Sequence, residues 1–182
     1  SIEREGIPVP VVTPVPLVNG LKYAPIQKLD SGIYPEHMVY LKSAGICGQS
    51  DLVEVVNNHV NITDYKTNKE IKTTGYTNWE GITDKMLHPI SNLDDCNLNH
   101  YALQLSIYMY IVLKHNPALF PGNIILQHVI FEEEFDKDPY GYPLYVKDAD
   151  GNPVIKNIVT YKLDYLKDEV ITLLSHYNQN KS

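Results

Sequence analysis

The chain contains very little arginine and cysteine, and it has no long apolar run. Arg4 is the only arginine, so bidentate arginine contacts to phosphate are scarce. Two cysteines, Cys47 and Cys96, are too few for a disulfide framework or a metal cluster, and both are predicted to be buried free thiols in a reducing compartment. No apolar run approaches the ~20 residues of a membrane span, and no signal-peptide pattern is present. We therefore expect no membrane contact and a cytoplasmic location.

Length and charge set further limits. The 182 residues, 43% of them hydrophobic, suit one domain with a substantial core. A net charge of −7 argues against a surface that grips nucleic acid everywhere, but it allows a local basic lining around an acidic metal site. Residues 1–35 are predicted to be a proline-rich extended segment or linker, and residues 36–182 a single domain. The first residue is Ser1 rather than Met, which is typical of a processed product or of a segment cut from a longer protein.

The most informative segment runs from Gly45 to Thr67 and predicts a β-hairpin with a two-residue turn at Asn57 and Asn58. With that turn, Asp51 lies opposite Asp64. Directly opposed like charges destabilise a strand pair, and such a broken local rule tends to mark a functional site. The other pairs on this face are Val53 with Ile62, Val55 with Val60, and Gln49 with Lys66.

A divalent cation between the two aspartates would resolve the conflict. Opposed Cβ atoms lie ~4.5–5.5 Å apart, so both carboxylates can reach one ion. Two carboxylates, the Tyr65 carbonyl and retained water form the hard oxygen environment that Mg²⁺ prefers. Lys66, two residues after Asp64, shares its face and can orient a water molecule or offset developing negative charge. The alternative is a surface hairpin whose Asp and Lys side chains are merely solvated.

The remaining pattern alternates strands and helices, with one long connection. Residues 67–96 predict a loop with short helical pieces, anchored by Trp79, Met86 and Leu87. Residues 97–115 predict an amphipathic helix that is capped by Asp94, Asp95 or Asn97 and ends at Asn116-Pro117. The other predicted elements are a strand at 37–42, a strand at 123–131, a second hairpin whose turn lies at 148–152, and a closing helix at 163–176.

Three short motifs resemble the PD-(D/E)XK nuclease superfamily, most of all its RecB-type exonuclease branch. They are G-I-C-G-Q-S-D-L-V, V-N-I-T-D-Y-K-T and Y-A-L-Q-L-S-I-Y, which contain the branch's G-x-x-D, D-Y-K-T and Q-x-x-x-Y patterns. In this chain those patterns are residues 48–51, 64–67 and 104–108. The resemblance covers residues 36–131 and identifies residues 36–182 as a nuclease-like domain.

The resemblance implies an α+β fold with a restriction-endonuclease-like αβββαβ core. A central mixed sheet would be flanked by helices, with an added C-terminal hairpin and helix. It also implies Mg²⁺- or Mn²⁺-dependent hydrolysis of DNA phosphodiester bonds in DNA repair or recombination. The expected enzyme is an exonuclease or a nuclease specific for DNA ends or single strands. The implied metal ligands are Asp51 and Asp64, with Lys66 assisting the nucleophilic water and Gln104 and Tyr108 beside the site on one helix face.

Glu36 just precedes the first predicted strand, where the family often carries an acidic residue, and is a candidate third ligand or base. A solvated loop glutamate is the alternative. The chain departs from the family in having proline-rich sequence where an N-terminal helix is usual, and it lacks the four cysteines of the iron–sulfur members. A second hypothesis is therefore a catalytically impaired nuclease-like domain that binds or assembles within a larger polypeptide or a replication or recombination complex. A third is a metal-dependent enzyme on another phosphoester.

Overall fold

The computed structural model describes residues 17–18, 21–22 and 26–180. Most of the predicted proline-rich segment, residues 1–16, 19–20 and 23–25, lies outside this range. The elements are β1 (Leu17–Val18), β2 (Leu21–Lys22), β3 (Gly32–Leu41), the 3₁₀ turn η1 (Lys42–Ala44), β4 (Ile46–Val56), β5 (His59–Lys66), α1 (Asn97–His115), β6 (Phe120–Phe131), β7 (Glu133–Lys137), β8 (Pro143–Tyr145), β9 (Ile155–Leu163) and α2 (Lys167–Gln179).

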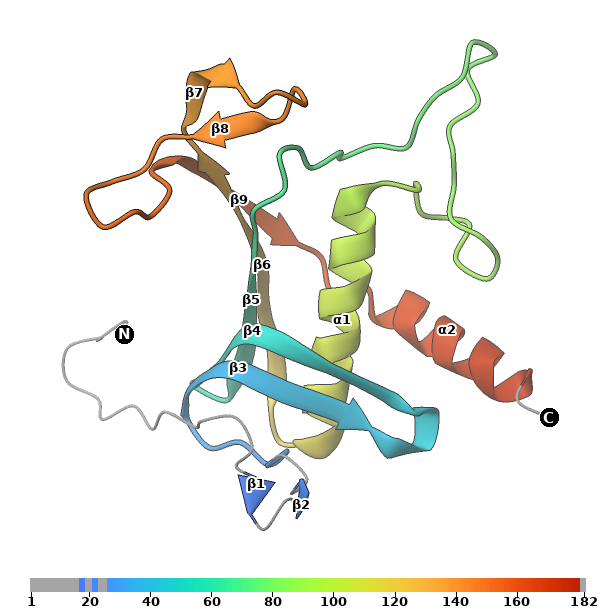
Figure 1. The fold of residues 1–182 in the computed structure, drawn as a ribbon. Coiled ribbons are helices and arrows are strands. Elements are labelled where there is room, and N and C mark those ends of the chain that lie inside the picture. Colours follow the sequence, from blue (N-terminus) through green and yellow to red (C-terminus); the bar gives the residue numbers. More distant parts are fainter. Residues whose placement is uncertain (1–16, 19–20, 23–25, 181–182) are drawn as a thin grey trace.

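A mixed five-stranded sheet forms the centre of the molecule, in the order β3-β4-β5-β6-β9. β5 and β6 are parallel, and α1 forms part of the crossover connection that a parallel pair requires. The other pairs are antiparallel. Figure 1 shows both helices on the same side of this sheet. The predicted combination of a mixed sheet with helices is confirmed, although in the described residues the helices cover one face rather than flanking both.

The hairpin of β4 and β5 has the predicted strands and the predicted turn. Asn57 and Asn58 have φ angles of 50° and 61°, the left-handed conformation of a tight hairpin turn that asparagine tolerates well. Val53 pairs with Ile62, as predicted from the sequence. This alternation places one face of the hairpin against α1, where the fully buried side chains of both elements form the core. Its members include Val53, Val55, Val60, Ile62, Leu105, Met109 and Val112.

The loop at residues 67–96 contains no helical turn, so the predicted helical pieces are wrong. It is held instead by two isolated β-bridges, Thr77 with Thr83 and Lys85 with Asp94. Met86 is buried as expected, whereas Trp79 and Leu87 are 92% and 86% exposed. Apolar residues without a helical or strand period have no common face, and so some of them are buried while others, among them Trp79 and Leu87, stay exposed.

The start of α1 differs from the predicted capping. The helix follows Cys96, and no side chain caps its first turn by a hydrogen bond. The Asn97 side chain instead accepts a hydrogen bond from Lys72 N at 3.1 Å, while Asp95 bonds His100. These side chains are therefore used by other contacts. The predicted end is confirmed, because Asn116 closes α1 with its side-chain amide on Val112 O at 2.8 Å.

The C-terminal third is more elaborate than predicted. Strands β7 and β8 form a separate small hairpin between β6 and the turn at Asp148, whose carboxylate accepts hydrogen bonds from two backbone amides at 2.9 Å. β9 returns to the main sheet and ends at Leu163, so the closing helix begins only at Lys167. Cys96 is buried, but Cys47 is exposed, contrary to expectation. Among the described residues, neither helix combines the length and the apolar sequence that crossing a membrane would require.

Candidate active site

The two aspartates of the hairpin meet where β4 and β5 separate. The ladder between these strands reaches Leu52 and Thr63 and stops there. Beyond that point β4 continues along β3, while β5 continues along β6. Asp51 Oδ2 accepts a hydrogen bond from Tyr65 N at 2.8 Å. A side-chain carboxylate of β4 therefore takes the place of a backbone carbonyl as the acceptor for this amide of β5. The predicted cross-strand pair of Gln49 and Lys66 does not form, because the strands have already diverged.

Asp64 lies on the face of β5 that packs against α1 and is 4% exposed. Its Oδ2 atom is 2.8 Å from Lys66 Nζ. Burial, together with the neighbouring Asp51 carboxylate, raises the pKa of Asp64 to about 6, and the Lys66 ammonium only partly opposes this rise. Two carboxylates that share a poorly solvated site without a sufficient counter-charge behave in this way. The like-charge conflict that the sequence predicts is therefore present in the structure.

Lys66 is held from two directions. Burial favours the neutral amine, but the hydrogen bond and charge of Asp64 outweigh burial, so the pKa of Lys66 is raised and the side chain stays charged. Its Nζ atom also lies 5.0 Å from the centre of the Tyr101 ring, within cation–π distance. The Tyr101 hydroxyl in turn accepts a hydrogen bond from Asn68 Nδ2 at 2.8 Å. These contacts fix the ammonium group beside Asp64.

Gln104 and Tyr108 lie on the same stripe of α1 as Tyr101. Gln104 Nε2 donates to the Tyr108 hydroxyl at 3.0 Å, and Tyr108 is buried. A Cβ atom at Gly48 would lie 2.6 Å from the Tyr108 ring, so only glycine lets β4 approach the helix this closely. Because Tyr101 contacts Lys66 and Tyr108 contacts β4, the stripe runs along the same side of the sheet as Asp64, with Gln104 exposed between them.

Glu36 occupies an irregular position in β3. It has a φ of 48°, and its neighbours Pro35 and His37 pair with Leu52 and Ser50, so the register places it opposite Asp51. Its backbone carbonyl accepts a hydrogen bond from Gln49 Nε2 at 3.2 Å, and its side chain is exposed. Within the described part of the chain, no group of three His, Cys, Asp or Glu side chains is arranged to hold a metal ion. Glu36 therefore does not complete a three-residue cluster with the two aspartates.

The Tyr65 carbonyl remains a suitable backbone ligand. In a β-strand the N–H and C=O of one residue point toward the same neighbouring strand. Since Tyr65 N–H points to Asp51, the Tyr65 carbonyl faces the same widening gap between β4 and β5. Two carboxylates and this carbonyl are hard oxygen donors, which is the ligand type that Mg²⁺ and Mn²⁺ prefer.

Sequence reasoning missed two residues around the site. Tyr101 is not among the predicted site residues, but its ring contacts Lys66. His128 is buried on β6 directly beside Lys66 in the parallel ladder, and its ring contacts the Asn68 carbonyl. Only the order of motifs along the chain is visible in the sequence, and the register of a parallel pair depends on the crossover helix. Nothing in the sequence therefore connected His128 to Lys66.

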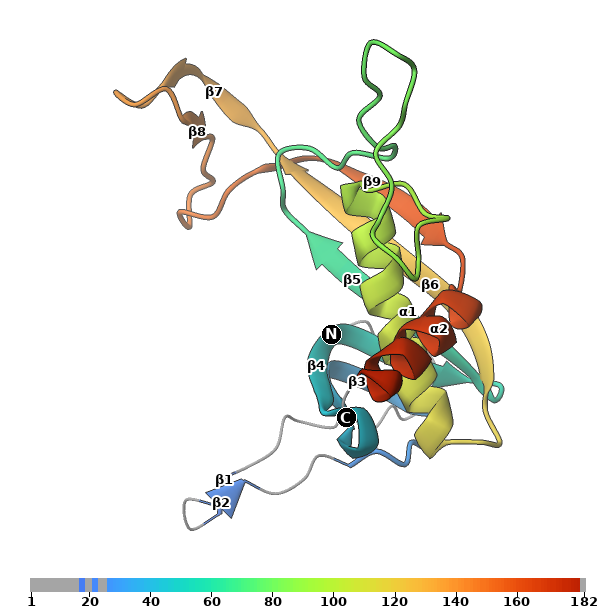
Figure 2. The ribbon, with the colours of Figure 1, turned by 90° about the vertical axis from the view of Figure 1, so that its right-hand side faces the viewer.

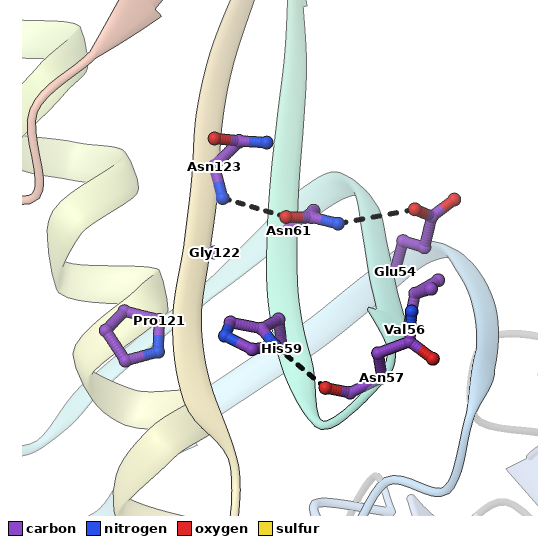
Figure 3. Close-up of a pocket in the computed structure, with 8 residues that line it drawn as sticks. All are labelled: Glu54, Val56, Asn57, His59, Asn61, Pro121, Gly122 and Asn123. Atoms are coloured by element: carbon purple, nitrogen blue, oxygen red, sulfur yellow. Dashed lines mark hydrogen bonds between the residues drawn. The ribbon is translucent and has the colours of Figure 1, made fainter.

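A separate polar pocket of about 510 Å³ opens on the opposite face of the hairpin (Figure 3). Its centre is Asn61, which donates to Glu54 Oε1 at 3.3 Å and accepts from Asn123 N at 2.8 Å. Glu54 and Asn61 alternate with the buried Val53 and Val60, so they point away from α1. None of the residues that line this pocket belongs to the aspartate–lysine site.

The chain matched no protein-family model, no curated protein and no solved structure in the comparisons made.

Proposed function

We propose that this chain is a divalent-metal-dependent nuclease that hydrolyses DNA phosphodiester bonds. The observation that carries the proposal is the meeting of Asp51 and Asp64 at the point where the hairpin opens, with Lys66 ion-paired to Asp64 at 2.8 Å. A strongly raised carboxyl pKa with a specific charged partner is typical of functional sites. The order of three antiparallel strands, a helix and a parallel strand supports the finer assignment to a restriction-endonuclease-like core.

In this proposal each residue has a distinct role. Asp51, Asp64 and the Tyr65 carbonyl would hold Mg²⁺ or Mn²⁺. When bound, such a cation polarises a phosphoryl oxygen and lowers the pKa of water. Lys66, kept charged by Asp64, would offset the negative charge that develops on the phosphate during hydrolysis. Gln104, exposed on α1, would contact the substrate, and its hydrogen bond to Tyr108 would fix its orientation.

Cleavage of labelled single- and double-stranded DNA with Mg²⁺ or Mn²⁺ tests the proposal directly. We expect Asp64→Ala and Lys66→Met each to lower the cleavage rate by at least about a hundredfold, since each removes a group that acts on the developing charge. Glu54→Gln is a matched control, because Glu54 lies on the same hairpin as Asp51 and Asp64 but points into the pocket on the opposite face. Wild-type protein that cleaves no DNA with either metal would contradict the proposal.

One observation favours the second hypothesis, a catalytically impaired nuclease-like domain that binds or assembles within a larger complex. The described residues supply two carboxylates at the site rather than a cluster of three side-chain ligands. Titration calorimetry with Mg²⁺ and Mn²⁺ separates the two hypotheses. A nuclease must bind at least one of these ions, and Asp64→Ala must abolish that heat. An impaired domain shows no heat with either ion while it remains fully folded.

A further inference from the structure

The loop at residues 67–96 leaves the main sheet directly after Lys66, which is the last residue of β5. A second segment, residues 132–154, begins where β6 ends. Figures 1 and 2 show both as projections past the end at which β5 finishes and α1 begins. A strand end that continues into a long loop is a place where a sheet opens easily. Lys66 is nevertheless held in place, and much of what holds it comes from outside β5.

Asn68 ties the start of the loop to two different elements. Its backbone carbonyl accepts a hydrogen bond from His128 Nε2 on β6, since a carbonyl oxygen cannot donate. Its side-chain amide donates to the Tyr101 hydroxyl on α1 at 2.8 Å. His128 is 4% exposed and pairs with Lys66 in the parallel ladder, so the support for Asn68 is itself fixed. Asn68 therefore joins β6 and α1 two residues after Lys66.

The next residues of the loop are attached to α1 as well. Lys72 N donates to Asn97 Oδ1 at 3.1 Å, and Lys72 O accepts from Leu98 N at 3.0 Å. Ile71, beside these contacts, is buried. The start of the loop therefore follows the start of α1, and the hydrogen bond to Tyr101 lies in this anchored part.

The Tyr101 ring lies beneath the Lys66 ammonium group, with Nζ 5.0 Å from the ring centre. Only 25% of the Lys66 side chain is exposed, so little water competes with this contact. A cation over an aromatic face is attracted by the quadrupole of the ring, and the attraction grows as water is removed. The ring therefore gives Lys66 a second holder, on a different element from Asp64.

The second holder matters because Asp64 has two tasks in the proposed function. In the structure its Oδ2 atom is 2.8 Å from Lys66 Nζ. As a ligand, Asp64 would share its charge with a divalent cation, and a bound cation is often the largest local charge in a site. The ion pair with Lys66 would then be weaker. The contact with the uncharged Tyr101 ring does not depend on the charge of Asp64, so it would keep Lys66 in place.

We propose that Tyr101 and Asn68 are positioning residues for Lys66. The Tyr101 ring holds the ammonium group independently of Asp64, and Asn68 holds the ring. Neither residue belongs to the G-x-x-D, D-Y-K-T or Q-x-x-x-Y patterns of the chain, and both act through Lys66 rather than on substrate. The inference deepens the proposed nuclease function and rests on it for the reaction that Lys66 serves.

Nuclear magnetic resonance tests the contact on the intact chain in EDTA, without cleavage. Lysine labelled at Cε and Nζ makes the ε-methylene signals visible, and Lys66→Met assigns the signal of Lys66. Protons over an aromatic face resonate upfield of their ordinary position. We expect this upfield shift for Lys66, retained in Asp64→Asn and lost in Tyr101→Leu. A wild-type Lys66 signal at its ordinary position, or a shift that is lost in Asp64→Asn, would overturn the inference.

Two variants break the hydrogen bond between Asn68 and Tyr101 from opposite sides. Asn68→Ala removes the donor, and Tyr101→Phe removes the hydroxyl but keeps the ring. We expect each to reduce the upfield shift of Lys66 by a similar fraction, and the double variant to add nothing further. Asn68→Asp should restore the shift, because its carboxylate can accept from the Tyr101 hydroxyl. Reductions that simply add in the double variant would contradict the role of Asn68.

Cleavage kinetics measure what the positioning contributes to the reaction. Lys66 acts on charge that develops in the transition state. We therefore expect Tyr101→Leu and Asn68→Ala to lower kcat at least about tenfold with KM nearly unchanged. Because Asn68 is exposed, its variants should fold normally, and circular dichroism checks this. Wild-type kcat in both variants would contradict a positioning role.

Tyr110→Leu is the matched control, because the Tyr110 ring lies 6.0 Å from Lys114 Nζ on the same helix. This variant should move the Lys114 signal and leave both the Lys66 signal and kcat unchanged. A fall in kcat equal to that of Tyr101→Leu would show that loss of any tyrosine from α1 impairs the enzyme, and would overturn the specific role of Tyr101.

The two proposals fail in different ways. The expected Lys66 signals in all variants, but without cleavage under any metal, contradict the nuclease function and leave the contact of Lys66 with Tyr101 in place. Metal-dependent cleavage that Tyr101→Leu and Asn68→Ala do not slow overturns the positioning role alone.

Discussion

The two ends of the hairpin formed by β4 and β5 obey opposite rules. Toward the turn, Val53 pairs with Ile62 and Val55 with Val60, and all four side chains are buried against α1. Toward the open end the ladder stops, and the next position on each strand is an aspartate. At the apolar end, residues that favour strands are also the ones that favour burial. At the charged end, like charges face each other and a carboxylate is buried, so both preferences are violated. Burial of the four apolar side chains stabilises the hairpin, whereas burial of Asp64 beside Asp51 opposes it.

The largest expected effect on folding comes from breaking the apolar end. Ile62→Ala removes a side chain that is completely buried between the sheet and α1. We expect a loss of about 2–5 kcal/mol in the free energy of unfolding, because the lost burial is compounded by a cavity. Chemical denaturation measures the change. Ile158→Ala on β9 provides the comparison, since this 48% exposed side chain should cost far less. Similar losses at both positions would contradict the assignment of the core to this end.

At the charged end, when no metal is present, we expect a substitution to raise the free energy of unfolding rather than lower it. The pKa of Asp64 is about 6 in the folded chain, above its ordinary value of 3.8, so the folded state binds a proton more tightly than the unfolded state. Stability from this group is therefore present at low pH and is lost as the pH rises through about 6. Asp64→Asn removes the penalty and should raise the free energy of unfolding at pH 7.5 by at most about 3 kcal/mol, with little change at pH 4.

Denaturation curves in EDTA at both pH values check this prediction. Asp94→Asn is the contrasting control, because the hydrogen bond from Lys85 lowers the pKa of Asp94. Its stability contribution is present above the ordinary pKa and is lost as the pH falls. Asp94→Asn should therefore destabilise the protein at pH 7.5 and have little effect at low pH. A destabilising Asp64→Asn at pH 7.5 in EDTA would show that the aspartate pair is not in conflict.

The contrast between the two ends also explains what the sequence could predict. Strand alternation, a two-residue asparagine turn and helical periodicity are local signals, and they located β4, β5 and α1 to the residue. They also placed Asp51, Asp64 and Lys66 on a common face. The divergence of the strands after Leu52 and Thr63 was not visible, because it depends on β4 remaining with β3 while β5 joins β6.

The projections were harder to predict for a related reason. Segments 67–96 and 132–154 have few buried positions, and so they lack the periodic pattern from which elements are recognised. Trp79 was expected to anchor the loop because it is large and apolar, but burial depends on a partner surface rather than on residue type. The hairpin of β7 and β8 was missed because both strands are short and because β7 is acidic, with charges at positions where strands usually carry β-branched residues.

An effect no larger than that at Asp64 is expected beyond the charged end, where β4 meets α1 at Gly48. Gly48→Ala places a methyl group 2.6 Å from the Tyr108 ring and forces the ring or the strand to move. We expect a loss of about 1–3 kcal/mol in the free energy of unfolding, the usual cost of overpacking. A double-mutant cycle identifies the cause. In a Tyr108→Ala background the ring is absent, so the added Gly48→Ala should cost almost nothing further. If the two losses simply add, the strain arises from the β4 backbone rather than from contact with Tyr108, and the close approach of helix and strand is not what requires glycine here.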